Sequence, residues 1–200
     1  MLEALTGTGL AASAGLNAYI PLVLMGLLSR YTDVINLPTG WQWLSNGWVL
    51  VILLVLLTVE VVADKVPVVD HVNDVVQTVV RPTAGGLAFG AGSSSQTATV
   101  TDPGQFFASH QWVPIAAGVL IALSVHGIKA VARPVVNAST AGFGAPVAST
   151  AEDATSVVMS LVAILLPVLV LVFVVLLAVL AGWLVRRRGR RRQLTGRTPG

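Results

Sequence analysis

The sequence predicts an all-α integral membrane protein with about four transmembrane helices and one amphipathic or re-entrant helix between the second and third spans. Of its 200 residues, 54% are hydrophobic and only 10% are charged, whereas soluble domains have about 25% charged residues. Four stretches approach the roughly 20 apolar residues that a spanning helix needs. A cluster of arginines follows the last stretch and predicts on which side of the membrane the chain ends.

The four predicted spans cover residues 5–28, 48–63, 113–131 and 156–185. The fourth span contains no charged residue, and Pro167 should kink it. Glu3 precedes the first stretch without any Lys or Arg, so the positive start of a cleavable secretory signal is missing. We therefore expect a multi-pass membrane domain over residues 1–185 and a disordered basic tail over residues 186–200.

The arginine cluster sets the expected orientation in the membrane. Basic residues that flank a span lie in the cytoplasm, which places the carboxyl end there, and four crossings place the amino end on the same side. Residues 31–47 and 132–155 would be outside, with Trp41, Trp43 and Trp48 as an aromatic belt at the headgroups. Candidates for contact with anionic lipid headgroups are Arg186, Arg187, Arg188, Arg190, Arg191 and Arg192.

Small residues distinguish the first predicted span from the last. Gly7, Ala11 and Gly15 recur every four residues and so lie on one face of a helix. Small side chains let two helix backbones approach closely in lipid, where packing drives association. We expect this helix to pack against another helix, with lipid-facing filler as the alternative. The last span is rich in Val and Leu all round and is the better candidate for a lipid-exposed helix.

Residues 68–81 have the clearest periodic pattern. Seven valines fall within an arc of about 140° at 100° per residue, while Asp70, Asp74, Gln77 and Arg81 lie on the opposite side. Adjacent valines break the strict alternation that a strand would need, so the pattern predicts an amphipathic helix. Because an anionic membrane surface would repel Asp70 and Asp74, we expect the valine face to pack against the spans and the acidic face to meet water.

A glycine-rich segment and a weak internal repeat complete the pattern. Residues 83–105 are rich in Gly, Ser and Thr and predict a flexible loop or a re-entrant turn. Residues 14–18 resemble residues 126–130, and Arg-Pro followed by glycine-rich sequence occurs at both Arg81 and Arg133. Duplicated halves with interrupted helices are typical of transporters, although such short matches also arise by chance in Ala- and Gly-rich chains.

Polar groups within the predicted spans are the candidate functional residues, because a charge in lipid is costly and usually faces the bundle interior. The side chain of Glu60 is too short to reach far toward the interface, which favours a carboxylate that binds a proton or cation. Lys129 would pair with Glu60 or Asp64 if the ends of the second and third spans meet, and His126 lies at similar depth. The candidate polar path comprises Glu60, Asp64, Lys65, Asp70, His71, Asp74, Arg81, Asn17, Lys129 and Arg133.

Simpler explanations stand beside this one. A position at the cytoplasmic interface would also explain Asp64 and Lys65. A hydrogen bond to another helix, which contributes about 1 kcal/mol in membranes, would explain Asn17. Asp70, His71 and Asp74 offer oxygen and imidazole ligands at one-turn spacing, which would suit a divalent cation. A solvated polar face explains these three residues more simply, so we expect no metal site.

Several function classes are disfavoured. The chain has no cysteine and contains no P-loop, dinucleotide fingerprint, His-Glu-x-x-His or nucleophile elbow, so we expect no catalytic residue and no cofactor. The net charge of +3 comes from the tail, since residues 1–185 hold five basic and nine acidic residues. We therefore expect no nucleic-acid partner. The expected partner is the lipid bilayer, and a homo-oligomer is left open.

Five motifs together carry a family resemblance. They lie at residues 15–22, 37–41, 60–67, 70–74 and 81–82, and the run Glu-Val-Val-Ala-Asp-Lys-Val-Pro is the most specific part. Over roughly residues 4–180 the chain resembles the bacterial membrane family of the domain of unknown function 4126. The resemblance implies a small multi-pass protein of unassigned activity in the bacterial inner (plasma) membrane. Ten arginines against two lysines suit a GC-rich bacterial genome.

The leading functional hypothesis is a small transporter or channel-like protein with a polar path lined by carboxylates. The alternative is a non-transporting membrane module that binds a protein partner or anionic lipid, with about 1 kcal/mol from each basic residue near the surface. An enzyme that acts on a lipid comes third, because no catalytic motif supports it.

Overall fold

The computed structural model describes residues 2–65, 67–93, 110, 112–140, 144–172 and 175, with only the backbone of residues 67–72, 134, 137 and 138. The predicted basic tail with its headgroup-binding arginines, and most of the second half of the fourth predicted span, lie outside these residues. The described residues form helices and no strand, which confirms the all-α prediction. The elements are α1 (Leu2–Leu16), α2 (Ile20–Tyr31), the 3-10 helix η1 (Thr39–Ser45), α3 (Gly47–Ala63), α4 (Pro67–Gly92), α6 (Trp112–Ser139) and α7 (Gly144–Leu165).

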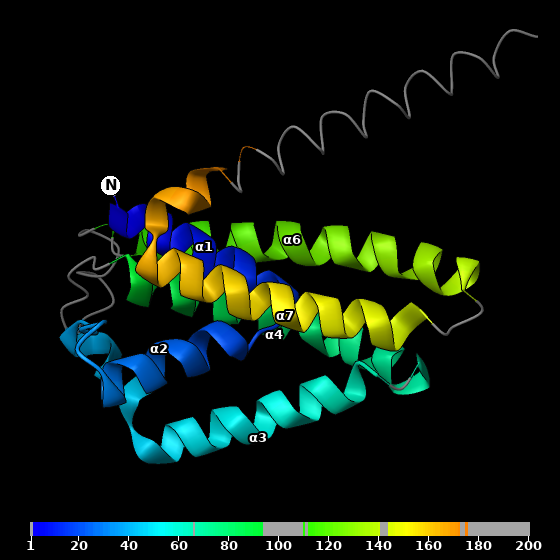
Figure 1. Cartoon of the computed structure of the whole chain (residues 1–200), viewed down its shortest axis with the longest axis horizontal. Helices are drawn as coiled ribbons and strands as arrows, with labels where there is room; N and C mark the ends of the chain where they lie inside the picture. Colours follow the sequence, from blue (N-terminus) through cyan, green and yellow to red (C-terminus); the bar gives the residue numbers. More distant parts are fainter. Residues whose placement is uncertain are drawn as a thin grey trace, which may run out of the picture.

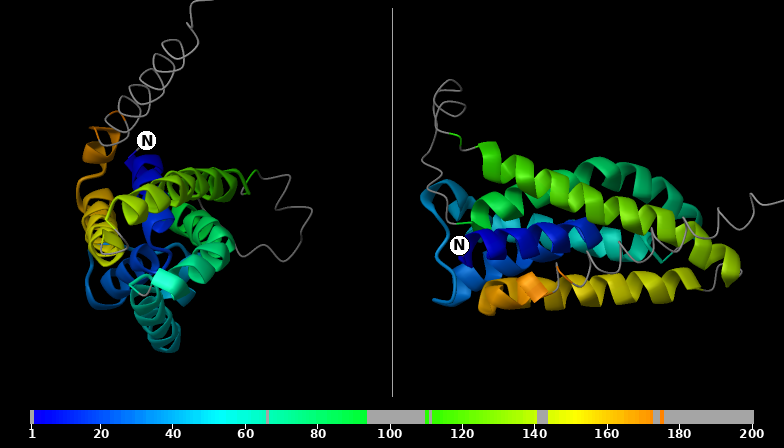
Figure 2. Two further views of the ribbon diagram at one scale, coloured as in Figure 1. Left: turned by 90° about the vertical axis from the view of Figure 1, so that its right-hand side faces the viewer. Right: turned by 90° about the horizontal axis from the view of Figure 1, so that it is seen from above.

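Four long helices, α3, α4, α6 and α7, lie side by side and alternate in direction (Figure 1). α3 leads into α4 at the same end of the bundle at which α6 leads into α7, as both views of Figure 2 also show. We call this end, marked by Asp64 and Thr140, the corner end. The bundle therefore brings the last turns of α3 and α6 near the first turns of α4 and α7.

α1 and α2 form a helical hairpin that enters the bundle from the end opposite the corner end (Figures 1 and 2). The outer part of α1 packs on α4 through Gly7 and Phe89, and the outer part of α2 packs on η1 through Gly26. The tip at Asn17 is fully buried. The prediction of one straight span over residues 5–28 is therefore wrong. Pro21, which has no N–H to donate, lies in the first turn of α2 and suits a new helix start there.

Two of the described helices are long and apolar enough to cross a membrane, namely the Trp112–Arg133 part of α6 and the whole of α7. A third crossing results if η1 and α3, which meet at a bend of 62°, are one broken span. The described residues thus contain two or three candidate spans where the sequence predicted four. These lengths and compositions are typical of a membrane protein.

The last helix begins earlier than predicted. α6 continues to Ser139 and α7 starts at Gly144, so most of residues 132–155, expected to form an outer loop, are helical. The helix is interrupted at Leu166, directly before Pro167, which agrees with the predicted kink. Within the described part of the last span, one face is buried and the opposite face is exposed, so exposure all round is not found there.

α4 is longer than the predicted helix and faces the other way. It passes through Pro82 and ends at Gly92, so the loop or turn predicted from residue 83 is wrong over this part. Val75 and Val79 are each 70% exposed, whereas Gln77 is 3% exposed and Arg81 is fully buried. The prediction that the valine face packs inward was therefore wrong, and the polar face lines the bundle interior.

Glycine lets α4 and α6 pack closely. A Cβ atom on Gly118 would collide with the backbone of Gly85, and one on Gly85 would collide with Ala122. Such small-residue contacts are typical of helix pairs in membranes. The glycines predicted to form a turn are therefore packing positions within a continuous helix.

α1 lies at the centre of the bundle and packs against other helices, and this packing is what its small residues predicted. All of its residues from Gly9 to Gly15 are buried, and Gly15 packs against Ala122 of α6. Ser13 joins α1 to α7, because its hydroxyl lies 2.7 Å from Ser156 Oγ and 2.6 Å from Ser160 Oγ. Close packing of small residues, the fully buried Leu10 and these hydrogen bonds together hold α1 in place.

The predicted aromatic belt is only partly formed. Trp48 is exposed at the start of α3, and Trp43 is partly exposed, but Trp41 is only 5% exposed and packs against Gly90 of α4. Trp41 therefore belongs to the core at the end opposite the corner end. The prediction for this residue was wrong because side-chain type alone does not separate a headgroup anchor from a core residue.

Candidate functional site

A network of buried charges lies toward the corner end of the bundle. Its side chains come from four helices and the residue that follows α3, and five of the six are at most 5% exposed. A charge inside a membrane protein is rare and costly unless it is paired. We call this set the ion network; it comprises Glu60, Asp64, Arg81, Lys129, Arg133 and Glu152.

Helical spacing places these groups on inward faces. Lys129 and Arg133 are four residues apart on α6, and Glu60 and Asp64 are four residues apart at the end of α3. Because α3 and α6 both end toward the corner end, the acidic pair meets the basic pair. Lys129 Nζ lies 3.3 Å from Asp64 Oδ2, which is one of the two pairings that the sequence suggested.

Arg81 of α4 is the most central member of the network. Its Nη2 donates to Glu60 Oε1 at 3.0 Å, and its Nη1 lies 3.1 Å from His126 Nδ1. A guanidinium only donates hydrogen bonds, so Nδ1 must accept and Nε2 must carry the proton of a neutral imidazole. Nε2 then donates to the Thr78 hydroxyl at 3.2 Å, and that hydroxyl donates to the Asp74 carbonyl at 2.8 Å. The chain of donors fixes the tautomer of His126.

Asp64 receives three cations on one oxygen. Arg81 Nη2 lies 3.5 Å from Oδ2, and Lys129 Nζ and Arg133 Nη2 each lie 3.3 Å from it. The other oxygen, Oδ1, accepts from Asn73 at 2.7 Å. Burial by itself raises the pKa of Asp64, but the three cations and Asn73 outweigh burial and hold its pKa below the ordinary value. Asp64 is therefore a carboxylate in this structure.

α7 contributes a pair of acids. Glu152 Oε2 lies 2.8 Å from Lys129 Nζ and 3.1 Å from Arg133 Nη2. Asp153 accepts from Asn17 at 2.9 Å and lies 3.7 Å from Lys65 Nζ. The ion network proper thus holds three acidic and three basic groups, and α7 is tied at this level to α6 and to the hairpin tip.

The hairpin tip contacts the same region. Asn17 Oδ1 accepts from the backbone N–H groups of Tyr19 and Ile20 at 3.1 and 3.2 Å, which stabilises the start of α2. Lys129 Nζ also donates to the Leu16 carbonyl at 3.3 Å, where α1 ends. Polar side chains therefore replace the backbone hydrogen bonds that the broken helix loses.

Some buried polar atoms of this region have no hydrogen-bond partner within the described residues. They are Glu60 Oε2, Gln77 Oε1 and Ser149 Oγ. A buried acceptor without a donor costs about 1–3 kcal/mol, and more when it is charged. Glu60 is notable because Arg81 satisfies one of its oxygens and leaves the other without a donor.

The structure brings together most of the predicted polar path. Five residues of the predicted path belong to the ion network, namely Glu60, Asp64, Arg81, Lys129 and Arg133. Three more contact it or lie beside it, namely Asn17, Lys65 and Asp74. Asp70 and His71 fall within α4, but their side chains lie outside the described residues. Among the residues described, no group of three metal-ligating side chains occurs.

Glu152 and Asp153 were missed because residues 132–155 were interpreted as a loop. The signal that would have found them is the spacing of Ser149, Ser156 and Ser160, which share one helix face with the acids between them. That segment is rich in small polar residues, so it lacks the apolar periodicity that normally marks a helix.

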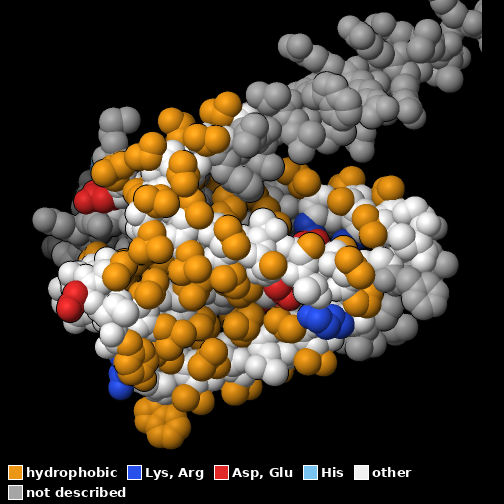
Figure 3. Space-filling view, in the orientation of Figure 1, with side chains coloured by type: hydrophobic (Ala, Val, Ile, Leu, Met, Phe, Trp, Pro, Cys, Tyr) orange, Lys and Arg blue, Asp and Glu red, His pale blue; other side chains and the backbone are white. Residues whose placement is uncertain are grey.

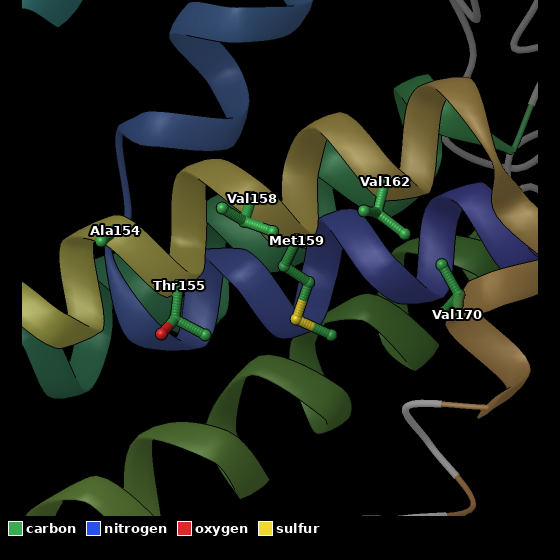
Figure 4. Close-up of a pocket in the computed structure, with 6 residues that line it drawn as sticks. All are labelled: Ala154, Thr155, Val158, Met159, Val162 and Val170. Carbon is green, nitrogen blue, oxygen red and sulfur yellow. The ribbon is translucent and has the colours of Figure 1, made fainter.

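An apolar groove of about 310 Å³ lies elsewhere, along α7 (Figure 4). Its walls include Val158, Met159 and Val162 of α7 and Val170 beyond the break. These side chains offer no charge and no general acid or base. The ion network, and not this groove, is therefore the candidate functional site.

Comparison with known proteins places the chain in a family without naming a reaction. The model of the family described as "Domain of unknown function (DUF4126)" matches residues 4–187. No curated protein matches the chain. No solved structure matches it either.

Proposed function

The chain belongs to the DUF4126 family, whose description assigns no activity, and from the geometry of its ion network we propose that it is a small secondary transporter driven by a proton that binds Glu60. One observation carries this proposal. The carboxylate of Glu60 is 1% exposed, Arg81 holds Oε1, and no donor among the described residues reaches Oε2. A proton on Oε2 would remove the buried negative charge and turn the unsatisfied acceptor into a donor.

The helical hairpin supports transport. Transporters commonly build their sites from interrupted helices, because exposed backbone groups at the break can bind ions or substrate. Here the break at Asn17 lies beside Lys129, which binds the last carbonyl of α1. We propose that α1 and α2 form a re-entrant pair with its tip at the substrate pathway, and that the four long helices around it cross the membrane.

The ion pairs that join α6 and α7 would form the gate of such a transporter. Glu152 is the partly exposed member of the network and bridges Lys129 and Arg133. Separation of α7 from α6 would break these pairs and open the interior toward the corner end. Ionic contacts suit a gate, because their desolvation cost and their attraction nearly balance.

Flux measurement in liposomes tests the proposal. The full chain is reconstituted with a trapped pH-sensitive dye, and a panel of organic acids, amines and sugars is added outside. We expect at least one solute to drive proton movement, and we expect Glu60→Gln to abolish it while the protein still inserts. Glu3→Gln is the matched control, because Glu3 is exposed in the first turn of α1.

Two outcomes would contradict the proposal. One is equal solute-driven proton movement by Glu60→Gln and wild type. The other is a chain that moves no solute but binds anionic vesicles through residues 186–200, which would identify the non-transporting module instead.

We propose that the protein lies in the bacterial inner membrane with its carboxyl end in the cytoplasm. The arginine cluster at residues 186–192 supports this side by the positive-inside rule. A reporter that is active only in the cytoplasm, fused after Gly200, should be active. A periplasmic reporter that is active at the same position would reverse the topology.

A further inference from the structure

We propose that Arg81, Lys129 and Arg133 form a binding site for the carboxylate group of a small organic anion, and that the chain's own Asp64 occupies this site in the present structure. The inference deepens the proposed function, because it names the class of substrate that a transporter with this network would carry. It rests on the geometry around Asp64 Oδ2, on the other partners of the three cations, and on the place of Asp64 in the chain.

The first argument is the convergence of three cations on one oxygen. Arg81, Lys129 and Arg133 approach Asp64 Oδ2 from two helices at 3.3–3.5 Å. Charge-assisted hydrogen bonds are normally about 2.7–2.9 Å long, and the Lys129–Glu152 pair reaches 2.8 Å. Asp64 thus shares its oxygen among three donors and makes no short bond with any of them. A ligand with two carboxylate oxygens would match the donors better.

The second argument is that the cations keep other partners when Asp64 leaves. Glu60 holds Arg81, and Glu152 holds both Lys129 and Arg133. Asp74 also stays 3.8 Å from Arg133 Nη1, so every one of the three cations keeps a carboxylate beside it. The donors that Asp64 releases would be open to one carboxylate group, and the planar guanidinium groups favour a carboxylate over a halide.

The third argument is the location of Asp64 itself. α3 ends at Ala63 and α4 begins at Pro67, so Asp64 lies in the corner between the two helices. Withdrawal of the carboxylate would need only the bond from Asp64 N–H to the Glu60 carbonyl, at the end of α3, and the bond from Asn73 to Asp64 Oδ1 to break. Asp64 is therefore placed to act as an internal competitor that a substrate carboxylate displaces.

Equilibrium binding tests the inference without any gradient. The full chain in detergent is titrated with sodium acetate and sodium propionate, with sodium chloride at equal ionic strength as reference, and its unfolding temperature is recorded. We expect both carboxylates to stabilise the wild type more than chloride does. Asp64→Asn removes the competitor and should tighten carboxylate binding about tenfold or more. The reason is that the apparent affinity of a site is proportional to the fraction of molecules in which the site is open.

Three further variants sharpen the test. Asp64→Glu keeps a competing carboxylate and should bind acetate far more weakly than Asp64→Asn. Lys129→Gln should lose the preference for carboxylate over chloride, while Asp33→Asn, at an exposed site, should behave as wild type. If Asp64→Asn folds in acetate but not in chloride, the site is supported. If it folds in neither salt, the unfolding temperature of the wild type in carboxylate against chloride decides.

The inference fails if carboxylates stabilise the wild type no more than chloride, or if Asp64→Asn binds them no more tightly than Asp64→Glu. These outcomes are separate from those for Glu60. Loss of proton coupling in Glu60→Gln with no carboxylate binding would leave the proposed function and remove the anion site. Carboxylate binding together with normal proton-coupled flux in Glu60→Gln would support the anion site and remove the proposed role of Glu60.

Discussion

Arg81 shows how a single residue can organise a membrane interior. It is fully buried, and its guanidinium contacts Glu60, Asp64 and His126 at once. A buried ion pair is weak evidence for stability, because desolvation cancels much of the attraction. Removal of one partner is different, since it leaves an uncompensated buried charge.

We predict that Arg81→Gln destabilises the protein by about 3–5 kcal/mol, because Glu60 and Asp64 lose a cation that water cannot replace. The midpoint of unfolding in a denaturing detergent mixture measures the effect. The double variant Glu60→Gln with Arg81→Gln should recover part of the loss. Arg30→Gln is the control, because Arg30 is exposed and bonds only to the Ser45 carbonyl among the described hydrogen bonds. Equal losses in Arg81→Gln and Arg30→Gln would contradict the central role of Arg81.

At the scale of the element, the sequence predicted the helix content, the close packing of α1 and the kink at Pro167, but not the break after Leu16. Small residues every four positions identified α1 as a packed helix. The turn after Leu16 was missed because Asn17 and Tyr19 interrupt an otherwise apolar run only weakly. α4 was predicted too short because Pro82 and the glycines after it are breakers in water, whereas in membrane helices neighbouring groups compensate for them.

The orientation of α4 is the one expected for a helix surrounded by lipid instead of water. The valine face was expected to pack inward because an anionic membrane surface would repel Asp70 and Asp74. In lipid, burial of apolar side chains does not drive helices together, so buried contacts are decided by polar pairing and close packing. Arg81 and Gln77 therefore point inward and Val79 points outward. Most residues of the predicted polar path lie together in the bundle, because the cost of a charge in lipid favours an interior position whatever the orientation of the helix.

Two glycines of α6 give a matched test of helix packing. A Cβ atom on Gly118 would collide with the backbone of Gly85 and with Phe89, whereas one on Gly127 would meet nothing within 4 Å. We predict that Gly118→Ala destabilises the protein by about 1–3 kcal/mol through overpacking. Gly127→Ala should be neutral or stabilising by about 0.5–1 kcal/mol, because Ala favours the helix. Unfolding midpoints of the two variants in one detergent provide the comparison, and equal midpoints would argue against a tight α4–α6 contact.

At the scale of the molecule, the described residues place a network of charges inside the bundle and many large apolar side chains on its surface. Figure 3 shows hydrophobic side chains over much of the face that includes α3 and α7, with few charged groups among them. Val158 and Leu165 of α7 and Val51 and Val55 of α3 are among the exposed residues. Soluble monomers rarely expose an apolar surface of this extent, so the surface fits a protein that is surrounded by lipid.

Introduced cysteines can test this inverted distribution, since the natural chain has none. In lipid vesicles, a fluorophore attached to Val79→Cys should be quenched strongly by brominated acyl chains, because Val79 is exposed on α4. Gln77→Cys, two residues away and buried, should react poorly with water-soluble and lipid-soluble thiol reagents alike. Ready labelling of Gln77→Cys by a water-soluble reagent, with no quenching at Val79→Cys, would show that α4 faces the other way.

The serine contact between α1 and α7 has a consequence for how the protein is made. Ser13 bonds to Ser156 and Ser160, which are 143 and 147 positions later in the chain. At a synthesis rate of about 5–20 residues per second, the ribosome needs roughly 7–30 s to deliver these partners. Throughout that interval the amino-terminal hairpin is without its final neighbours, while Asn17 at its tip has no Asp153 to bind. The insertion machinery must therefore hold the hairpin of α1 and α2, with its polar tip unpaired, until the last helix emerges, and assembly is completed only near the end of translation.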